Sequence, residues 1–232
     1  KNAVHPAQVM AVVKANGYGH GSVDIAKTTL ENGATFLGVA FHEEGIELRK
    51  AGIKAPVLVF GAQLETFFEE HIKYDLEITL SRYEQIERLE NICKKLNKKA
   101  RVHIKFDTGM GRVGFKTDAD ISSLLALTEH PWIEVTGVYS HLSSADEDDL
   151  SVTYKQLENF NHIRSAFLKH TKKPILFHIA NSAAIMRLPQ AYFDMVRPGV
   201  MLYGNPPGPD FKLEWDLKEV MRFVSRVTAV KE

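Results

Sequence analysis

Short apolar runs rich in β-branched residues alternate with longer amphipathic segments along nearly the whole chain, and this alternation limits the possible folds to very few. Each short run is typical of a buried parallel strand, and each longer segment, with apolar residues three or four positions apart, is typical of a helix that covers it. The expected strands are Val9–Lys14, Phe36–Ala40, Pro56–Phe60, Glu77–Leu80, Arg101–Phe106, Val135–Tyr139, Ile175–Ile179 and Met195–Val196. The expected helices are Ser22–Asn32, Glu43–Ala51, Leu64–Lys73, Arg82–Leu96, Asp118–Glu129 and Thr153–Leu168.

Eight strands alternating with helices, without a linker rich in Pro, Gly or Ser, predict an α/β fold, namely a single (β/α)₈ barrel of the TIM type over residues 1–209. An open doubly wound sheet is the alternative that the same alternation allows. Within the expected helix Arg82–Leu96, Cys93 falls on the apolar face. We therefore expect Cys93 to be a core residue rather than a nucleophile.

The end of the chain breaks the alternation. Residues 204–209 form a loop rich in Gly and Pro, and Val220–Val230 then alternates in the manner of a strand. We expect residues 210–232 to be the start of a connection to a C-terminal β domain that is absent from this chain. The chain also begins without an initiator Met, so we expect its N-terminal lead-in to be truncated.

The composition excludes several classes of function. Apolar residues make up 44% of the chain, enough to fill a large core, and 29 Lys and Arg balance 29 Asp and Glu. Because nucleic-acid-binding and membrane-surface proteins normally carry a basic excess, we expect neither partner. No apolar run approaches the roughly 20 residues of a transmembrane helix. A single cysteine cannot build a disulfide framework within the chain, which favours a reducing compartment such as the cytoplasm.

Unusual residues cluster directly after the expected strand ends, where a barrel places its active site. Five segments share this position, namely Lys14–Gly21, Lys105–Arg112, Tyr139–His141, His178–Ser182 and Arg197–Val200. Five such segments at equivalent positions predict one shared site at the C-terminal end of the barrel.

Two lysines in these segments are candidates for chemistry. Lys14 ends an apolar run and precedes a glycine-rich turn, which lets a ligand approach the backbone closely. A desolvated lysine can form a Schiff base with an aldehyde cofactor, and a lysine that reaches solvent is the alternative. Alternation along Arg101–Phe106 points Lys105 into the barrel. There it must lose its proton, be chemically modified or pair with a carboxylate such as Asp107.

A phosphate site is expected near the last two strands. Ser182 begins a short helical run, and Gly199 and Val200 follow the last strand. Helix N-termini and glycine backbones at these strands of a barrel commonly bind a phosphate, to which Tyr18 adds a hydroxyl. A plain N-cap at Ser182 is the alternative.

Two other patterns carry less weight. Gly109–Gly114 matches the G-x-G-x-x-G pattern of dinucleotide-binding proteins, but the acidic residue that such a site needs precedes the next expected strand instead of ending it. His141 and His178 lack the spacing and the Cys companions of a zinc site, so we expect no metal. The acidic run Asp146–Asp149 is expected to be a solvated loop.

The segment Val12–Gly21, with the sequence VVKANGYGHG, resembles the pyridoxal phosphate signature of bacterial alanine racemases. Lys105–Gly114, Ser140–His141, His178–Ser182 and Val196–Gly199 resemble the same family in the same order, so the resemblance covers nearly the whole chain. It implies a barrel domain that binds pyridoxal 5′-phosphate and a C-terminal β domain that completes a dimeric active site.

The resemblance also implies a role for each site residue. Lys14 would carry the cofactor and act as one of two catalytic bases, the second being a tyrosine in the C-terminal domain of the partner subunit. Arg197 would face the pyridine nitrogen, supported by His141. Arg112 would reach the phenolic oxygen of the cofactor, and Lys105 would be carbamylated and paired with Arg112. The remaining contacts to the cofactor, including its phosphate, would come from Tyr18, Asn181, Ser182, Gly199 and Val200.

The function implied by the resemblance is the interconversion of L-alanine and D-alanine by a cytoplasmic homodimer, which supplies D-alanine for peptidoglycan. Three alternatives stay open: a serine-preferring racemase, a barrel that binds the cofactor without turnover, and a related decarboxylase. The decarboxylase is disfavoured because its triple-glycine phosphate loop is not found in the sequence.

Overall fold

The computed structural model describes residues 2–117, 121–212, 215–222 and 224–231. Its strands are β1 (Gln8–Val12), β2 (Phe36–Val39), β3 (Val57–Val59), β4 (Glu77–Leu80), β5 (Ala100–Asp107), β6 (Phe115–Lys116), β7 (Ile133–Tyr139), β8 (Leu176–His178) and β9 (Met195–Val196). Its α-helices are α1 (Lys14–Tyr18), α2 (Ser22–Glu31), α3 (His42–Lys50), α4 (Phe68–Lys73), α5 (Glu84–Leu96), α6 (Ile121–Ala126), α7 (Ser151–His170) and α8 (Ser182–Arg187). Short 3₁₀ helices lie at Asn2–Val4, Glu65–Phe67, Leu127–Glu129, Pro189–Ala191 and Val200–Tyr203.

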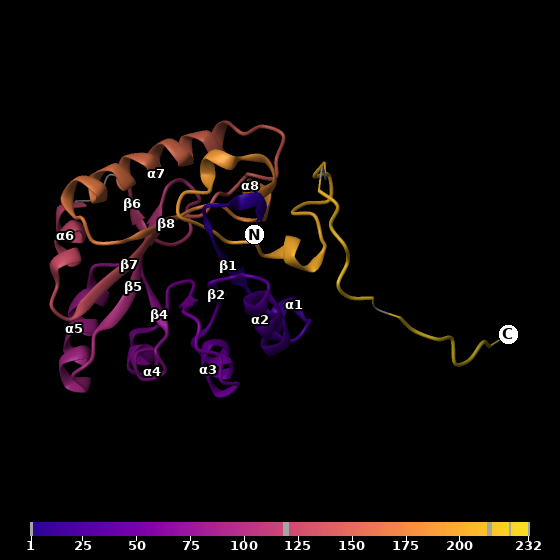
Figure 1. The fold of residues 1–232 in the computed structure, drawn as a ribbon, viewed down its shortest axis with the longest axis horizontal. Coiled ribbons are helices and arrows are strands. Elements are labelled where there is room, and N and C mark those ends of the chain that lie inside the picture. The colour runs from indigo at the N-terminus through magenta and orange to yellow at the C-terminus, as the bar shows by residue number, and fades with distance from the viewer. Residues whose placement is uncertain (1, 118–120, 213–214, 223, 232) are drawn as a thin grey trace.

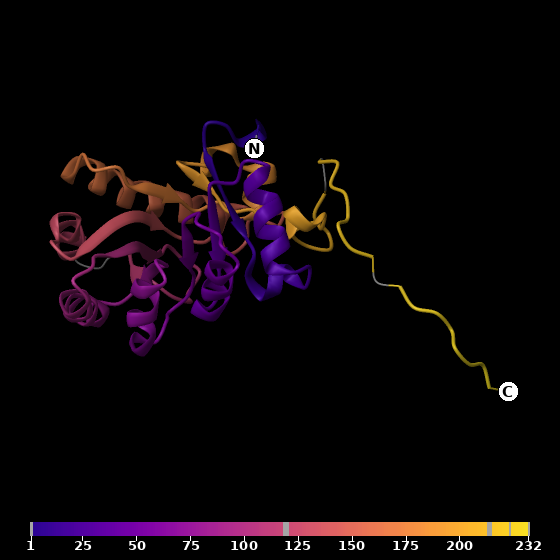
Figure 2. The ribbon, with the colours of Figure 1, turned by 60° about the horizontal axis from the view of Figure 1, so that its bottom comes forward.

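The strands form a parallel barrel with helices around it (Figure 1, and Figure 2 in a turned view). They pair in the order β8-β7-β5-β4-β3-β2-β1-β9, and β6 pairs with β5 beside this path. The two ends of the path meet, because the Asp194 N–H donates to the Phe177 carbonyl and the Arg197 N–H donates to the Ala180 carbonyl, both at 3.0 Å. The expected (β/α)₈ barrel is confirmed, and the open doubly wound sheet is wrong.

Alternate residues of each strand face the interior of the barrel and the surrounding helices. Met10 of β1 packs inside the barrel in a buried cluster with residues of four other strands, Phe36, Leu58, Tyr139 and Met195. Its neighbour Ala11 belongs instead to the cluster that includes Ala26 of α2 and Leu48 of α3. Because strands of such a barrel are buried on both faces, they form continuous apolar runs in the sequence.

Several element boundaries differ from the expected ones. The first strand ends at Val12 and not at Lys14, because a turn of left-handed backbone begins three residues later, at Ala15. The helix expected over Leu64–Lys73 is a 3₁₀ turn followed by α4. Residues 118–120, where the next helix was expected to begin, lie outside the described residues, and α6 covers Ile121–Ala126. The short strand β6 was not expected, since two residues are too few to show a period.

The alternating segment Val220–Val230 was expected to belong with a β domain absent from this chain, and that expectation stays a prediction. Its described part, residues 220–222 and 224–230, contains no strand here. The chain leads away from the barrel there (Figures 1 and 2). Val224, Val227 and Val230 are 80%, 82% and 85% exposed. A strand forms only with a hydrogen-bonded neighbour, so an alternating pattern without one stays an extended segment.

A glycine in β7 makes room for a buried imidazole. The pairing of β5 with β7 shifts register after Val102, so that Gly137 and not Thr136 lies opposite His103. A Cβ atom on Gly137 would collide with the ring of His103, which is itself completely buried. The absence of a side chain at Gly137 is therefore required by close packing.

We predict that Gly137→Ala lowers the free energy of unfolding by about 1–3 kcal/mol, the usual cost of overpacking a core. Urea denaturation of the purified chain measures it. The matched control is Gly208→Ala, whose Cβ would lie 3.3 Å from the carboxylate of the exposed side chain of Asp146, which can move. We expect the control to change stability by less than about 0.5 kcal/mol. Equal losses in the two variants would contradict this explanation of Gly137.

Candidate active site

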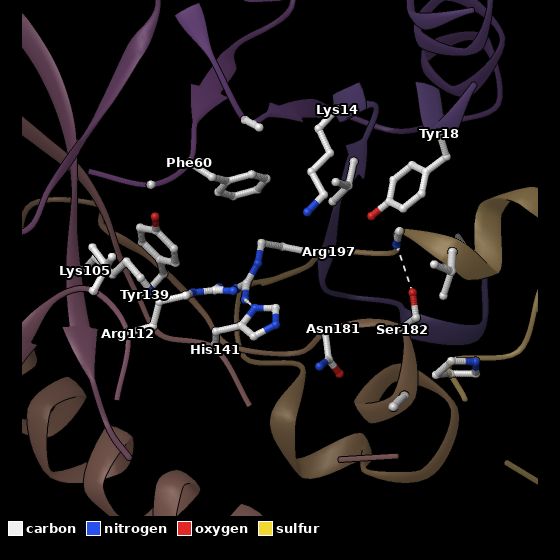
Figure 3. A pocket seen from close by; sticks show the side chains of 18 of the residues that line it. Lys14, Tyr18, Phe60, Lys105, Arg112, Tyr139, His141, Asn181, Ser182 and Arg197 are labelled. Carbon is white, nitrogen blue, oxygen red and sulfur yellow. Dashed lines mark hydrogen bonds between the residues drawn. The ribbon is translucent and has the colours of Figure 1, made fainter. Parts of the chain in front are cut away.

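A cavity of about 510 Å³ opens at the C-terminal ends of the strands, within the size range of pockets that bind small molecules and cofactors. Figure 3 shows its labelled side chains, of which Lys105 and Tyr139 belong to β5 and β7 and the others come from the segments after β1, β3, β5, β7, β8 and β9. All of the expected site residues line this one cavity, namely Lys14, Tyr18, Lys105, Arg112, His141, Asn181, Ser182, Arg197, Gly199 and Val200. Their roles stay predictions, but the structure brings them together.

Lys14 and Tyr18 are positioned by a left-handed turn. Ala15, Asn16, Gly17 and Tyr18 have φ values of 53°, 52°, 60° and 52°. Left-handed backbone costs roughly 1–2 kcal/mol for each residue other than glycine, so other groups must stabilise the turn. Asn16 accepts the Ser22 N–H through its side-chain oxygen at 2.9 Å. As a result, Lys14 and Tyr18 both point into the cavity, with the Lys14 amine 5.9 Å from the centre of the Tyr18 ring (Figure 3).

Glu44 of α3 stabilises the same turn from outside. One carboxylate oxygen accepts the N–H of Ala15 at 2.6 Å, and the other accepts those of Ala40 and Phe41 at 2.7 and 3.0 Å. The residue that follows Lys14 is therefore tied to the loop after β2 and to the beginning of α3.

Ser182, Gly199 and Tyr18 form a polar cradle on one side of the cavity. The Gly199 N–H donates to the Ser182 hydroxyl oxygen at 2.9 Å, drawn as a dashed line in Figure 3. A Cβ atom on Gly199 would lie 2.8 Å from the Tyr18 hydroxyl oxygen, so only glycine leaves this space open. The N-cap of α8 is Asn181, whose side-chain oxygen accepts the Ala184 N–H at 3.1 Å. The alternative reading of Ser182 as a plain N-cap is therefore wrong.

Arg197 is buried at the opening of the barrel, and acceptors surround its two terminal guanidinium nitrogens. Its Nη2 donates to the carbonyls of Ser140 and Ile179 at 2.7 and 3.1 Å, and lies 3.4 Å from Nδ1 of His141. Its Nη1 donates to Nδ1 of His178 at 2.9 Å. Burial lowers the pKa of Arg197 to about 10, which still leaves the guanidinium charged at neutral pH.

The two histidines beside Arg197 are neutral at neutral pH. Burial and, next, the positive charge of Arg197 lower the pKa of His178 well below its usual value. Desolvation and the nearby charges of Arg197 and Lys105 do the same to the pKa of His141. Both rings therefore act as hydrogen-bond partners of the guanidinium and not as cations.

Lys105 lies inside the barrel, as strand alternation predicted, and is only 5% exposed. Its amine lies 4.9 Å from the centre of the Tyr139 ring. Burial, followed by repulsion from Arg197 and Arg112, lowers the pKa of Lys105 to about 7. At neutral pH a large share of this amine is therefore unprotonated and nucleophilic.

Asp107 is not the ion-pair partner of Lys105. Its carboxylate accepts the backbone N–H groups of Gly109, Gly111 and Arg112 at 3.1, 3.0 and 2.9 Å, and so folds the loop that carries Arg112. Its negative charge acts against the lowering of the pKa of Lys105 but does not outweigh burial and the two arginines. The same loop leads into β6 and not into a helix, so the geometry does not support a dinucleotide site.

Sequence reasoning missed several residues of the site. Phe41, Phe60, Gln63 and Asp146 also line the cavity, so one residue of the expected solvated acidic loop is near its opening. His103 and Glu77 are buried beneath it. The sequence signal for His103 and Glu77 was weak, since it consists only of an imidazole or a carboxylate side chain within an otherwise apolar strand. Within the described residues there is no cluster of three His, Cys, Asp or Glu side chains suited to a metal, and no helix long and apolar enough to cross a membrane.

Comparisons with known proteins agree on one family. The family model described as "Alanine racemase, N-terminal domain" matches residues 1–207 of this chain. Alanine racemase 1 of Oceanobacillus iheyensis is 40% identical over 97% of the chain, and the alanine racemase of Clostridium tetani is 40% identical over 100% of it. The chain spans 60% of the length of each of these curated relatives.

Solved structures give the same assignment. The alanine racemase of Clostridium difficile in complex with cycloserine is 35% identical with a TM-score of 0.90, covering 94% of this chain and 61% of the other. The alanine racemase of Bacillus anthracis with bound L-Ala-P is 35% identical with a TM-score of 0.84, covering 92% of this chain and 56% of the other. This chain therefore belongs to the alanine racemase family and contains its N-terminal barrel domain.

Proposed function

We propose that this chain is the cofactor-binding part of an enzyme that interconverts L-alanine and D-alanine and so supplies D-alanine for peptidoglycan. The observation that carries the proposal is one cavity that holds the Lys14 amine, the Ser182–Gly199–Tyr18 cradle and the buried Arg197 guanidinium. The names of the relatives support it, as do the alanine racemases solved with cycloserine and with L-Ala-P.

The residues present fit pyridoxal 5′-phosphate. The aldehyde of the cofactor needs an amine, which Lys14 offers at the cavity wall. The phosphate needs hydrogen-bond donors, which the Gly199 N–H and the hydroxyls of Tyr18 and Ser182 offer. A Cβ atom on Gly199 would fill the space between them. When bound, this cofactor makes the Cα proton of an amino acid easier to remove by delocalising the resulting charge. Val200 would add a backbone amide to the cradle, and Asn181 would add an amide side chain beside it.

Arg197 would face the pyridine nitrogen of the cofactor. A guanidinium donates hydrogen bonds but does not give up its proton, so this ring nitrogen would stay unprotonated. The bonds to Ser140, Ile179 and His178 hold the guanidinium in one orientation, and His141 packs beside it. Arg112, carried by the loop that Asp107 folds, would reach the phenolic oxygen.

Racemisation requires a proton to leave one face of Cα and another to arrive at the opposite face. Lys14, fixed at one wall of the cavity, would serve one face only. His141 is held beside Arg197, and the Tyr139 hydroxyl is hydrogen-bonded to Thr79 at 2.8 Å while burial raises the pKa of Tyr139 to about 12. Neither fits the second role. The family resemblance implies that a tyrosine beyond this chain, from the partner subunit of a homodimer, would supply it.

Lys105 would be carbamylated. Its unprotonated amine would add to carbon dioxide, forming an N–C bond and releasing one proton to solvent. The carbamate would replace a buried amine that Arg197 and Arg112 repel by an anion, which Arg112 could then pair with. The burial of Lys105 inside the barrel, which lowers the pKa of its amine to about 7, supports this modification.

Three wider inferences accompany this proposal. Residues 1–209 would form the cofactor-binding domain, and residues 210–232 would begin the connection to a C-terminal β domain. The single cysteine, Cys93, is buried and free, in keeping with the reducing cytoplasm as the location. A preference for serine over alanine is the alternative substrate choice within the same reaction.

We predict that the chain with added pyridoxal phosphate exchanges the Cα proton of alanine in D₂O and inverts it far more slowly. Lys14→Ala should reduce the exchange by roughly 10²–10⁴-fold, because a positioned base is lost. NMR measures the deuterium uptake, and optical rotation measures the inversion. The control is Lys27→Ala, which removes an exposed lysine of α2 and should exchange like the unmodified chain.

Three outcomes of that experiment would count against the proposal. Exchange that is equal in the unmodified chain and in Lys14→Ala would remove Lys14 from the reaction. Inversion as fast as exchange would place the second base inside this chain. Cofactor binding without any exchange would favour the barrel that binds pyridoxal phosphate without turnover.

We also predict a carbamate on Lys105. Addition of ¹³C-bicarbonate should give a carbamate carbon signal by NMR that grows as the pH is raised through 7, because the neutral amine is the reactive form and the pKa of Lys105 is about 7. The signal should be lost in Lys105→Met and kept in Lys27→Ala. A signal that survives in Lys105→Met, or none in the unmodified chain, would contradict the modification.

A further inference from the structure

Three hydrogen bonds in series cross the interior of the barrel beneath the cavity. The first joins Nη1 of Arg197 to Nδ1 of His178 at 2.9 Å, and the second joins Nε2 of His178 to Nδ1 of His103 at 2.8 Å. The third joins Nε2 of His103 to a carboxylate oxygen of Glu77 at 2.9 Å. Arg197 follows the end of β9 and Glu77 begins β4, so the series connects the open end of the barrel with its opposite end.

The chemistry of Arg197 sets the direction of every bond in this series. A guanidinium can only donate, so Nδ1 of His178 must accept, and the proton of the neutral His178 ring is on Nε2. That proton is donated to Nδ1 of His103, which must also accept. His103 therefore carries its own proton on Nε2 and donates it to Glu77. All donors point from Arg197 towards the carboxylate.

The same logic determines the charge of His103. A doubly protonated His103 would carry a proton on its Nδ1, which faces Nε2 of His178. Nε2 of His178 would then have to accept a hydrogen bond, although Nδ1 of the same His178 ring already accepts one from Arg197. That state requires His178 without a ring proton, which does not occur at neutral pH. His103 is therefore neutral although it lies against a carboxylate, and the negative charge of the series stays on Glu77.

Glu77 is ionised and enclosed at its end of the series. The Glu77 side chain is buried, and the hydrogen bonds from His103 and Thr136 together with the nearby charge of Arg101 stabilise its ionised carboxylate. The Thr136 hydroxyl donates to the same oxygen at 2.7 Å, and Arg101 approaches the other oxygen at 3.6 Å.

The two imidazoles of the series have no room to reorient. His103 and His178 are completely buried. The ring of His178 stacks on Tyr139 with centres 4.9 Å apart and 2° between the planes. Gly137 leaves just enough space for the ring of His103.

We propose that Glu77 is a positioning residue that, through His103 and His178, orients the Arg197 guanidinium and stabilises its charge where it faces the cavity. The inference rests on the proposed function, which gives Arg197 a role towards the cofactor. No hydrogen bond among the described residues occupies the Nε–H of Arg197, and Arg197 lines the cavity. On the side of the guanidinium away from the cavity, Nη1 is linked to the Glu77 carboxylate through three hydrogen bonds in series.

The first test is ¹⁵N NMR of histidine-labelled protein without cofactor. It distinguishes the two neutral tautomers of each imidazole from the imidazolium. We expect both His103 and His178 as the Nε2–H tautomer at neutral pH, as the direction of the hydrogen bonds requires. An imidazolium at His103, or a proton on Nδ1 of either ring, would overturn the one-way series.

The second test compares Glu77→Leu, Glu77→Gln and the control Thr136→Val, again without cofactor, by solvent exchange of the Arg197 Nε–H. Glu77→Leu should speed that exchange by about two- to thirtyfold, the range of energetic coupling between linked residues. Glu77→Gln should keep both tautomers, since its amide oxygen can accept from His103, and should speed the exchange less. Thr136→Val, which loses a bond to the same carboxylate but not a link of the series, should leave the exchange rate unchanged.

Exchange rates in the folded Glu77 variants equal to that of Thr136→Val would overturn the positioning role. If Glu77→Leu does not fold, Glu77→Gln decides the question by the same comparison.

Titration with pyridoxal phosphate then separates the two proposals. Failure of the unmodified chain to bind it would contradict the proposed function but not the anchoring of Arg197, whereas equal affinity in all variants would contradict an effect of Glu77 on the cofactor.

Discussion

Burial of one guanidinium organises both the barrel and its site. A buried cation is tolerated only when acceptors surround it, and Arg197 finds them in the carbonyls of Ser140 and Ile179 and in the ring of His178. These acceptors follow or end β7 and β8, whereas Arg197 follows β9. The strand path ends at β8 and β9, so the guanidinium also ties together the two strands at which the barrel closes. The charge that faces the cavity is thus part of the closure of the fold.

The left-handed turn after β1 is the second constraint, and it places the reactive amine. Ala15, Asn16 and Tyr18 adopt backbone conformations that non-glycine residues avoid. Glu44 and Asn16 hold the turn through bonds to the N–H groups of Ala15 and Ser22. Strain of this kind persists where surrounding structure enforces it, and at functional sites it sets geometry before a ligand arrives. Here it directs Lys14 and Tyr18 into the same cavity as Arg197.

Much of this arrangement could be predicted from the sequence, because strands buried on both faces form apolar runs and barrel sites follow strand ends. The strand β4 (Glu77–Leu80) has the predicted bounds, and Lys105 faces inward as alternation requires. The series from Arg197 to Glu77 could not be predicted, since its members are far apart in the chain and meet only when the barrel closes. The described residues 220–222 and 224–230 illustrate the opposite case, since their alternation is clear but a strand also depends on a neighbour that the pattern cannot reveal.

The measurement that most directly tests this account is a crystal structure of the chain after incubation with pyridoxal phosphate and reduction with borohydride. The account predicts electron density that joins the cofactor to the Lys14 amine, with its phosphate against Gly199, Ser182 and Tyr18 and its ring nitrogen towards Arg197. Density joined to Lys105 or to a surface lysine, or a phosphate bound away from this cradle, would contradict it.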